Sequence, residues 1–129
     1  MNQSPTDART ATRFFDAHLH IIDRRFPLEA NQGYRPAPFT VAEYRTATTG
    51  LNVIGGAVVS ASFQRGHNHL RASLAELGPN FVGVADLHPD ATDAELQSLD
   101  AAGVRGMRVN LYRGGREALD QLERLAHRV

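Results

Sequence analysis

The residues best suited to chemistry lie near the N-terminus, in the largely apolar stretch 14–22. Asp16, His18 and His20 are spaced two apart there, and side chains at that spacing share one face of a β-strand. Two imidazoles on one face can bind a single divalent ion through nitrogen, which offsets the cost of polar groups on a buried strand. The alternative is a pair of half-buried histidines bonded to Asp16 or to the backbone.

A second polar set lies in the apolar stretch 104–112, where Arg108 and Asn110 share one parity. Arginine inside an apolar strand is rarely tolerated without an anionic partner. A guanidinium can hold a substrate carboxylate through two parallel hydrogen bonds, which is one of two roles open to Arg108. The alternative is an internal ion pair with Asp16 or Asp86.

Two further groups carry weaker signals. Ser60 and Ser62 stand on one parity at the end of the apolar run 52–60. They either hydrogen-bond a substrate beside the histidine pair or simply end a strand. His67 and His69 stand where a helix begins, and side chains two apart on a helix diverge. We therefore expect a solvated helix start at these two histidines and not a metal site.

The elements that must position these residues alternate regularly. Apolar runs of strand length at 14–22, 52–60, 81–87 and 104–112 are followed by segments of helical character at 41–48, 68–77, 93–102 and 116–128. Capping boxes at Thr40/Glu43 and Thr92/Glu95 mark two helix starts. Alternation of this kind predicts an α/β fold with a parallel sheet and right-handed crossovers. Four such units, (βα)4, are the first half of a TIM (β/α)8 barrel, or else a small open sheet of the flavodoxin kind.

Length and composition limit the functions open to the chain. Its 129 residues suit one domain, which we place at 14–129 after a polar, flexible terminus at 1–13. Every one of the 14 basic residues is arginine and cysteine is absent, so lysine Schiff bases, carbamylated lysine ligands and thiolate chemistry are excluded. The balanced charge gives no reason to expect binding to nucleic acid. No apolar run is long enough to span a membrane, so we expect a cytoplasmic location.

The stretches DAHLH at 16–20 and GVRGMRVN at 103–110 together resemble the amidohydrolase superfamily. The resemblance is to the amidohydrolase-2 branch, which includes 2-pyrone-4,6-dicarboxylate lactonase-like TIM-barrel hydrolases. The capped stretch 90–96 is also similar to that branch. The likeness runs over nearly the whole chain from Phe14, but it covers only the N-terminal half of the family's barrel.

This resemblance implies hydrolysis of an ester, lactone or amide bond, or a related decarboxylation, in a small carboxylated substrate. His18 and His20 match the histidines that bind one divalent, zinc-like ion in metal-dependent members, while other members of the branch act without metal. Arg108 and Asn110 stand where binuclear members carry a bridging ligand, which argues against a two-metal site. By resemblance Arg108 contacts the substrate carboxylate.

The resemblance also implies what the chain lacks. In the family the aspartate that serves as general base comes from the eighth strand, so no catalytic residue is assigned here, and we expect no turnover by this chain alone. A four-stranded parallel sheet leaves two open edges, which favour a homo-oligomer through edge association. The competing class is a non-enzymatic α/β module that binds a small anion, a metal or a partner protein.

Overall fold

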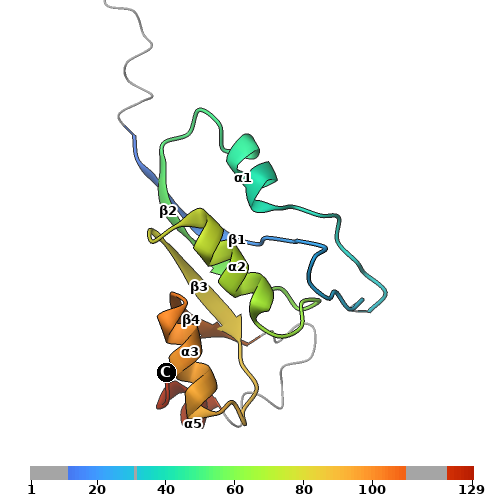
Figure 1. The fold of residues 1–129 in the computed structure, drawn as a ribbon, viewed down its shortest axis with the longest axis vertical. Coiled ribbons are helices and arrows are strands. Elements are labelled where there is room, and N and C mark those ends of the chain that lie inside the picture. The colour runs from blue at the N-terminus through green and yellow to red at the C-terminus, as the bar shows by residue number, and fades with distance from the viewer. Residues whose placement is uncertain (1–11, 31, 110–121) are drawn as a thin grey trace, which may run out of the picture.

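The computed structural model describes residues 12–30, 32–109 and 122–129, and its centre is a parallel sheet (Figure 1). Adjacent strands follow the order β1-β2-β3-β4, with no reversal of strand order. A doubly wound sheet reverses its order at a switch point, so sequential order is the arrangement of a barrel half and not of a flavodoxin-like sheet. The strands are β1 (Phe14–Leu19), β2 (Val53–Val59), β3 (Phe81–Asp86) and β4 (Val104–Arg108).

Helices connect the strands as the periodicity predicts. They are α1 (Val41–Ala47), α2 (Asn68–Leu77), α3 (Asp93–Ala101) and α5 (Leu122–Ala126). The predicted (βα)4 arrangement is confirmed as an open parallel sheet that corresponds to half of a TIM barrel. The predicted flexible terminus falls almost wholly on residues 1–11. Residues 110–121 include the end of the predicted fourth strand and the start of the helix predicted after it. Both segments lie outside the described residues.

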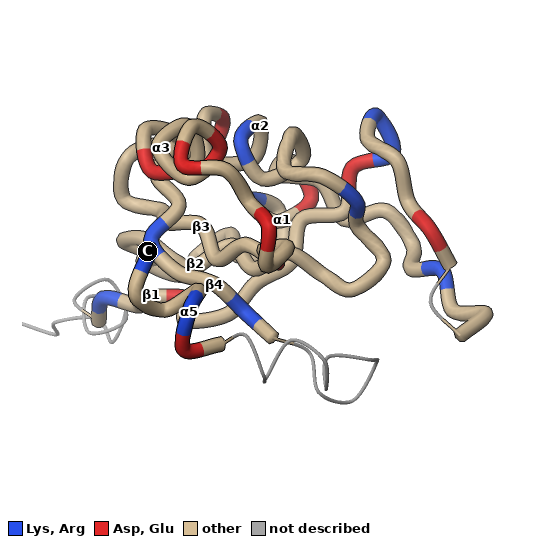
Figure 2. The backbone as a smooth tube through the Cα atoms, turned by 90° about the horizontal axis from the view of Figure 1, so that it is seen from below, with Lys and Arg blue, Asp and Glu red and all other residues tan. Residues whose placement is uncertain are grey.

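The hydrophobic core lies between the sheet and its covering helices. Figure 2 shows α2 and α3 together on one side of the sheet. Leu70 and Leu74 of α2 are buried, and Leu77 packs against the same cluster, as their helical spacing predicts. They meet the strand residues Leu19 and Val58. Neither α2 nor α3 covers the opposite face of the sheet, which we call the open face.

The exposed edge of the sheet is most evident on β1. Phe14 and Phe15 remain 45% and 55% exposed, although phenylalanine usually lies inside. Within the described chain β1 pairs only with β2, and β4 pairs only with β3. The sheet therefore presents two unpaired edges and an open face, and in a complete barrel that face lines the interior.

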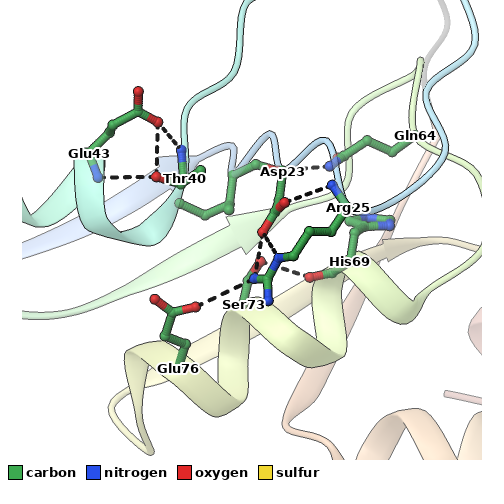
Figure 3. Close-up of polar contacts among 9 residues, drawn as sticks. Asp23, Arg25, Thr40, Glu43, Gln64, His69, Ser73 and Glu76 are labelled. Carbon is green, nitrogen blue, oxygen red and sulfur yellow. Dashed lines mark hydrogen bonds and ion pairs between the residues drawn. The ribbon is translucent and has the colours of Figure 1, made fainter.

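A capping box starts α1, as the sequence predicts. The Thr40 backbone N–H donates to Glu43 Oε2 at 2.6 Å, and the Glu43 backbone N–H donates to Thr40 Oγ1 at 3.3 Å (Figure 3). The hydrogen bond from the Thr40 backbone is the main reason why the pKa of Glu43 is lowered. Two backbone donors that helix formation leaves unpaired are thereby satisfied.

Removing this cap has a predictable cost. Thr40→Ala deletes the hydroxyl acceptor and is expected to lower the free energy of unfolding by about 1 kcal/mol. Thr46→Ala is the matched control, because Thr46 lies inside the same helix and donates only to the Ala42 carbonyl. Urea denaturation of both variants measures the difference. Equal stability of the two variants would show that the cap contributes nothing.

Candidate functional site

His20 follows β1 and is held by the backbone of the neighbouring strand. Its Nδ1 lies 2.7 Å from the carbonyl oxygen of Val59, the last residue of β2. A carbonyl only accepts hydrogen bonds, so Nδ1 carries the proton and Nε2 keeps its lone pair. Burial lowers the pKa of His20, and the positive charges of His18 and Arg108 act in the same direction. The hydrogen bond to Val59 opposes this lowering of the pKa in part. In the neutral ring that burial favours, Nε2 is the nitrogen free to bind a ligand.

His18 lies beside His20 on the open face of the sheet. The two ring centroids are 4.9 Å apart with the ring planes at 82°, an edge-to-face arrangement. Leu19, between them, points into the core, so the two flanking histidines point to the opposite face. The predicted convergence of the pair at the carboxyl end of β1 is what the structure shows.

Arg108 reaches the same place from the far side of the sheet. It is the last residue of β4, and its Nη1 donates to the carbonyl of Ser60 at 2.7 Å. Met107 packs against the core, which turns Arg108 to the open face. Within the described chain no ion pair joins Arg108 to an acid, so the alternative of an internal pair with Asp16 or Asp86 does not hold there.

We call His18, His20 and Arg108 the strand-end cluster. Two successive carbonyls at the end of β2 hold two of its members: that of Val59 binds His20, and that of Ser60 binds Arg108. Polar side chains from the ends of β1 and β4 thus meet, over the backbone carbonyls at the end of β2, at the carboxyl edge of a parallel sheet, which is where barrel and open-sheet enzymes place their sites. The cluster combines an anion-binding guanidinium with two metal-competent nitrogens.

The prediction that Asp16 shares the histidine face is wrong. Three residues of β1, from Asp16 to Leu19, advance against two of β2, a bulge that breaks the two-residue alternation. The Asp16 carboxylate therefore points to the helix side, where it accepts a hydrogen bond from the Tyr44 hydroxyl at 3.1 Å. Burial, together with this hydrogen bond, raises the pKa of Tyr44 to about 12.

The serines and Asn110 are the other predicted substrate contacts. Ser60 is 2% exposed and its hydroxyl lies 3.2 Å from His69 Nε2, so it faces the helix side, and its contact with substrate stays a prediction. What Ser60 offers the cluster is its carbonyl. Ser62 is half-buried in the following turn, and its substrate contact stays a prediction. Asn110 lies outside the described residues.

His67 and His69 are not solvated, which corrects the expectation for this helix start. His69 is 4% exposed, and burial, with the nearby charge of His67, lowers its pKa to about 4. His67 binds the Asp86 carbonyl at 3.0 Å and Glu95 Oε1 at 3.0 Å, which ties α2 to the start of α3. The signal was available: His69 falls on the same helical face as Ser73 and the core leucines of α2.

The fit of a metal ion to the cluster is partial. Zinc takes three or four protein ligands in known sites. Among the described residues no three histidines or acids group to hold an ion, so the histidine pair supplies two ligands. The Arg108 charge opposes a cation and favours an anion nearby. The cluster therefore fits part of a metal site that also holds a carboxylate.

The parallel βα array, with a polar cluster at its strand ends, is the arrangement of half of a (β/α) barrel. The chain belongs to the amidohydrolase family, which it matches over residues 15–128. A 2-pyrone-4,6-dicarboxylate hydrolase of Comamonas testosteroni is 31% identical over 101 residues, which are 76% of this chain and 33% of that protein.

Two solved structures share the fold. One, from Agrobacterium tumefaciens in its apo form, has a TM-score of 0.74 and 24% identity, over 88% of this chain and 43% of that chain. The other is a probable 2-pyrone-4,6-dicarboxylic acid hydrolase of Acinetobacter baumannii with citric acid bound. It has a TM-score of 0.77 and 22% identity, over 88% of this chain and 44% of that chain. The chain thus spans a third of the curated relative and under half of these structures. In its described part, none of the helices has the length and apolar character needed to cross a membrane.

Proposed function

We propose that the strand-end cluster is part of the active site of a hydrolase that cleaves an ester, lactone or amide bond in a small carboxylated substrate. The observation that carries this proposal is the meeting of Arg108 with His18 and His20 at the carboxyl edge of the sheet. Family membership supports the reaction class. The names of two relatives, one a 2-pyrone-4,6-dicarboxylate hydrolase and the other a probable one, support a substrate with more than one carboxylate.

In this proposal each member of the cluster has its own role. Arg108 holds a substrate carboxylate through its guanidinium, which the Ser60 carbonyl orients from one side. His18 and His20 hold one divalent, zinc-like ion, with His20 using Nε2 because Val59 occupies Nδ1. Such an ion, when bound, polarises a carbonyl and lowers the pKa of a bound water.

Turnover needs a further group. Hydrolysis requires a base that takes a proton from water. Asp16 is turned to Tyr44, and Asp86, which lies opposite Arg108 in the β3–β4 register, forms no ion pair with it among the described residues, so we assign the base to neither carboxylate. We therefore expect this chain by itself to bind a carboxylated ligand without hydrolysing it. The same proposal includes self-association, because both outer strands leave backbone donors and acceptors unpaired in the described sheet.

Self-association is tested by solution mass. We expect light scattering to give at least twice the chain mass of 14.1 kDa. Pairing of two copies along β1 and β4 would satisfy the open edges and cover Phe14 and Phe15. A cooperatively folded monomer at all concentrations would contradict this part of the proposal.

Carboxylate binding is tested by calorimetry with citrate as the probe. Arg108→Gln is expected to weaken citrate binding by about tenfold or more, since a hydrogen bond to a charged group contributes roughly 1.5–3 kcal/mol. Arg105→Gln is the matched control, because Arg105 lies on the same strand, is exposed and pairs with Asp100 at 2.8 Å. Equal affinities of the two variants would contradict the proposal and favour a non-enzymatic α/β module.

A further inference from the structure

A buried polar pair lies directly behind the strand-end cluster. His69 of α2 and Ser60 after β2 are 4% and 2% exposed, and His69 Nε2 lies 3.2 Å from Ser60 Oγ. The His69 ring comes from the helix side of the sheet, while the cluster lies on the open face. Its helix turn is fixed in addition by Ser73, whose hydroxyl donates to the His69 carbonyl at 2.7 Å (Figure 3).

Ser60 is the residue of this pair that also contacts the strand-end cluster. Its hydroxyl contacts His69 and its carbonyl accepts the hydrogen bond of Arg108 at 2.7 Å. Its backbone N–H donates to the Val84 carbonyl at 2.9 Å, which ties the same residue to β3. The preceding carbonyl, that of Val59, holds His20. A rotation of the backbone at Ser60 would therefore misdirect both contacts.

A histidine is a costly choice for this place if packing were its only task. In the described chain the His69 Nδ1 is buried and has no hydrogen-bond partner, and an unpaired buried polar atom costs free energy. Its neighbours Leu70 and Leu74 show that this face of α2 accepts leucine. The interaction that a histidine makes here and a leucine could not is the contact of Nε2 with the Ser60 hydroxyl.

We propose that His69 is a positioning residue of the site, which acts through Ser60 to hold the two carbonyls that orient Arg108 and His20. The chemistry of the ligand rests on the proposed function above. The proposed effect of His69 on the orientation of Arg108 does not depend on that function, because this orientation is a property of the unliganded chain.

The variants are chosen around the Nε2 contact. His69→Gln places an amide nitrogen where Nε2 stood and is expected to restore the contact with Ser60, whereas His69→Leu removes it. Ser60→Ala removes the hydroxyl but keeps the carbonyl, and it serves where His69→Leu does not fold. Ser73→Ala is the matched control, since it deletes a buried hydroxyl of the same helix that bonds only to the backbone.

The first readout is the crystal structure of each variant without ligand. The Arg108 Nη1 to Ser60 carbonyl contact is expected to persist in His69→Gln and Ser73→Ala and to be lost in His69→Leu and Ser60→Ala. Retention of the contact in both of the last two variants would overturn the proposal. This readout is independent of whether the chain binds a carboxylate at all.

The second readout is citrate affinity, which separates positioning from stability. His69→Leu is expected to weaken citrate binding by about fivefold or more, a factor typical of coupling between contacting residues, and His69→Gln to recover it. In an Arg108→Gln background His69→Leu is expected to add nothing. Equal losses in both backgrounds would show that His69 does not act through Arg108. If wild type binds no citrate, the proposed function fails while the structural readout still decides the role of His69.

Discussion

Gly55→Ala is expected to lower the free energy of unfolding by roughly 3 kcal/mol, the upper range of the cost of overpacking a well-packed site. A Cβ at Gly55 would lie 2.3 Å from the Asn80 carbonyl oxygen, closer than any side-chain atom tolerates. The obstacle is backbone, so a rotamer change cannot relieve it. The strand and the turn before β3 would have to separate.

Gly106→Ala is the matched control for this effect. Gly106 also lies inside a strand, but its Cβ would meet only the Val84 side chain at 3.6 Å, an ordinary contact distance. We expect urea denaturation to show a much smaller change for Gly106→Ala. If Gly55→Ala were as stable as Gly106→Ala, the close approach of β2 to Asn80 would be wrong.

His69 gives the second large effect, a dependence of stability on pH. Burial lowers the pKa of His69 from 6.5 to about 4, so below pH 6.5 the unfolded chain binds a proton that the folded chain does not. The free energy of unfolding therefore falls as the pH falls from 6.5 towards 4 and levels off below that. The full contribution is roughly 3 kcal/mol, because one pKa unit corresponds to about 1.4 kcal/mol.

The measurement is the difference between wild type and His69→Leu across that range. A group with a lowered pKa that lies away from the Ser60 contacts, such as the Arg25-bonded Asp23, affects both proteins and cancels in the difference. The stability of His69→Leu relative to wild type is expected to rise as the pH falls from 6.5 to 4. Parallel stability curves would contradict the burial of a neutral His69.

The fold could be predicted from the sequence because its signals are local. Apolar runs of strand length, helical periodicity and capping residues each act within one element, and their alternation leaves few topologies. The sequence also indicated His18, His20 and Arg108 as separate candidates, and the structure brings them together because the carboxyl ends of parallel strands share one edge. The family resemblance added the reaction class.

The errors arise where the backbone departs from regular geometry or where a partner is distant in sequence. The bulge in β1 turns Asp16 to Tyr44, and no residue type in the stretch marks it. Ser60 points to a histidine that lies on the next helix. The carbonyls that hold His20 and Arg108 are backbone atoms, which every residue carries, so the sequence does not reveal them.

Zinc binding tests the central claim, that the strand ends form one ligand site, most directly. Calorimetry on the chelator-treated chain is expected to show about one zinc ion bound per chain, held by the histidine pair. The His18→Ala/His20→Ala double variant is expected to lose this binding, while His88→Ala, in an exposed turn, keeps it. Zinc binding that survives in the double variant, or that is absent from a folded wild type, would contradict a metal role for the strand-end cluster.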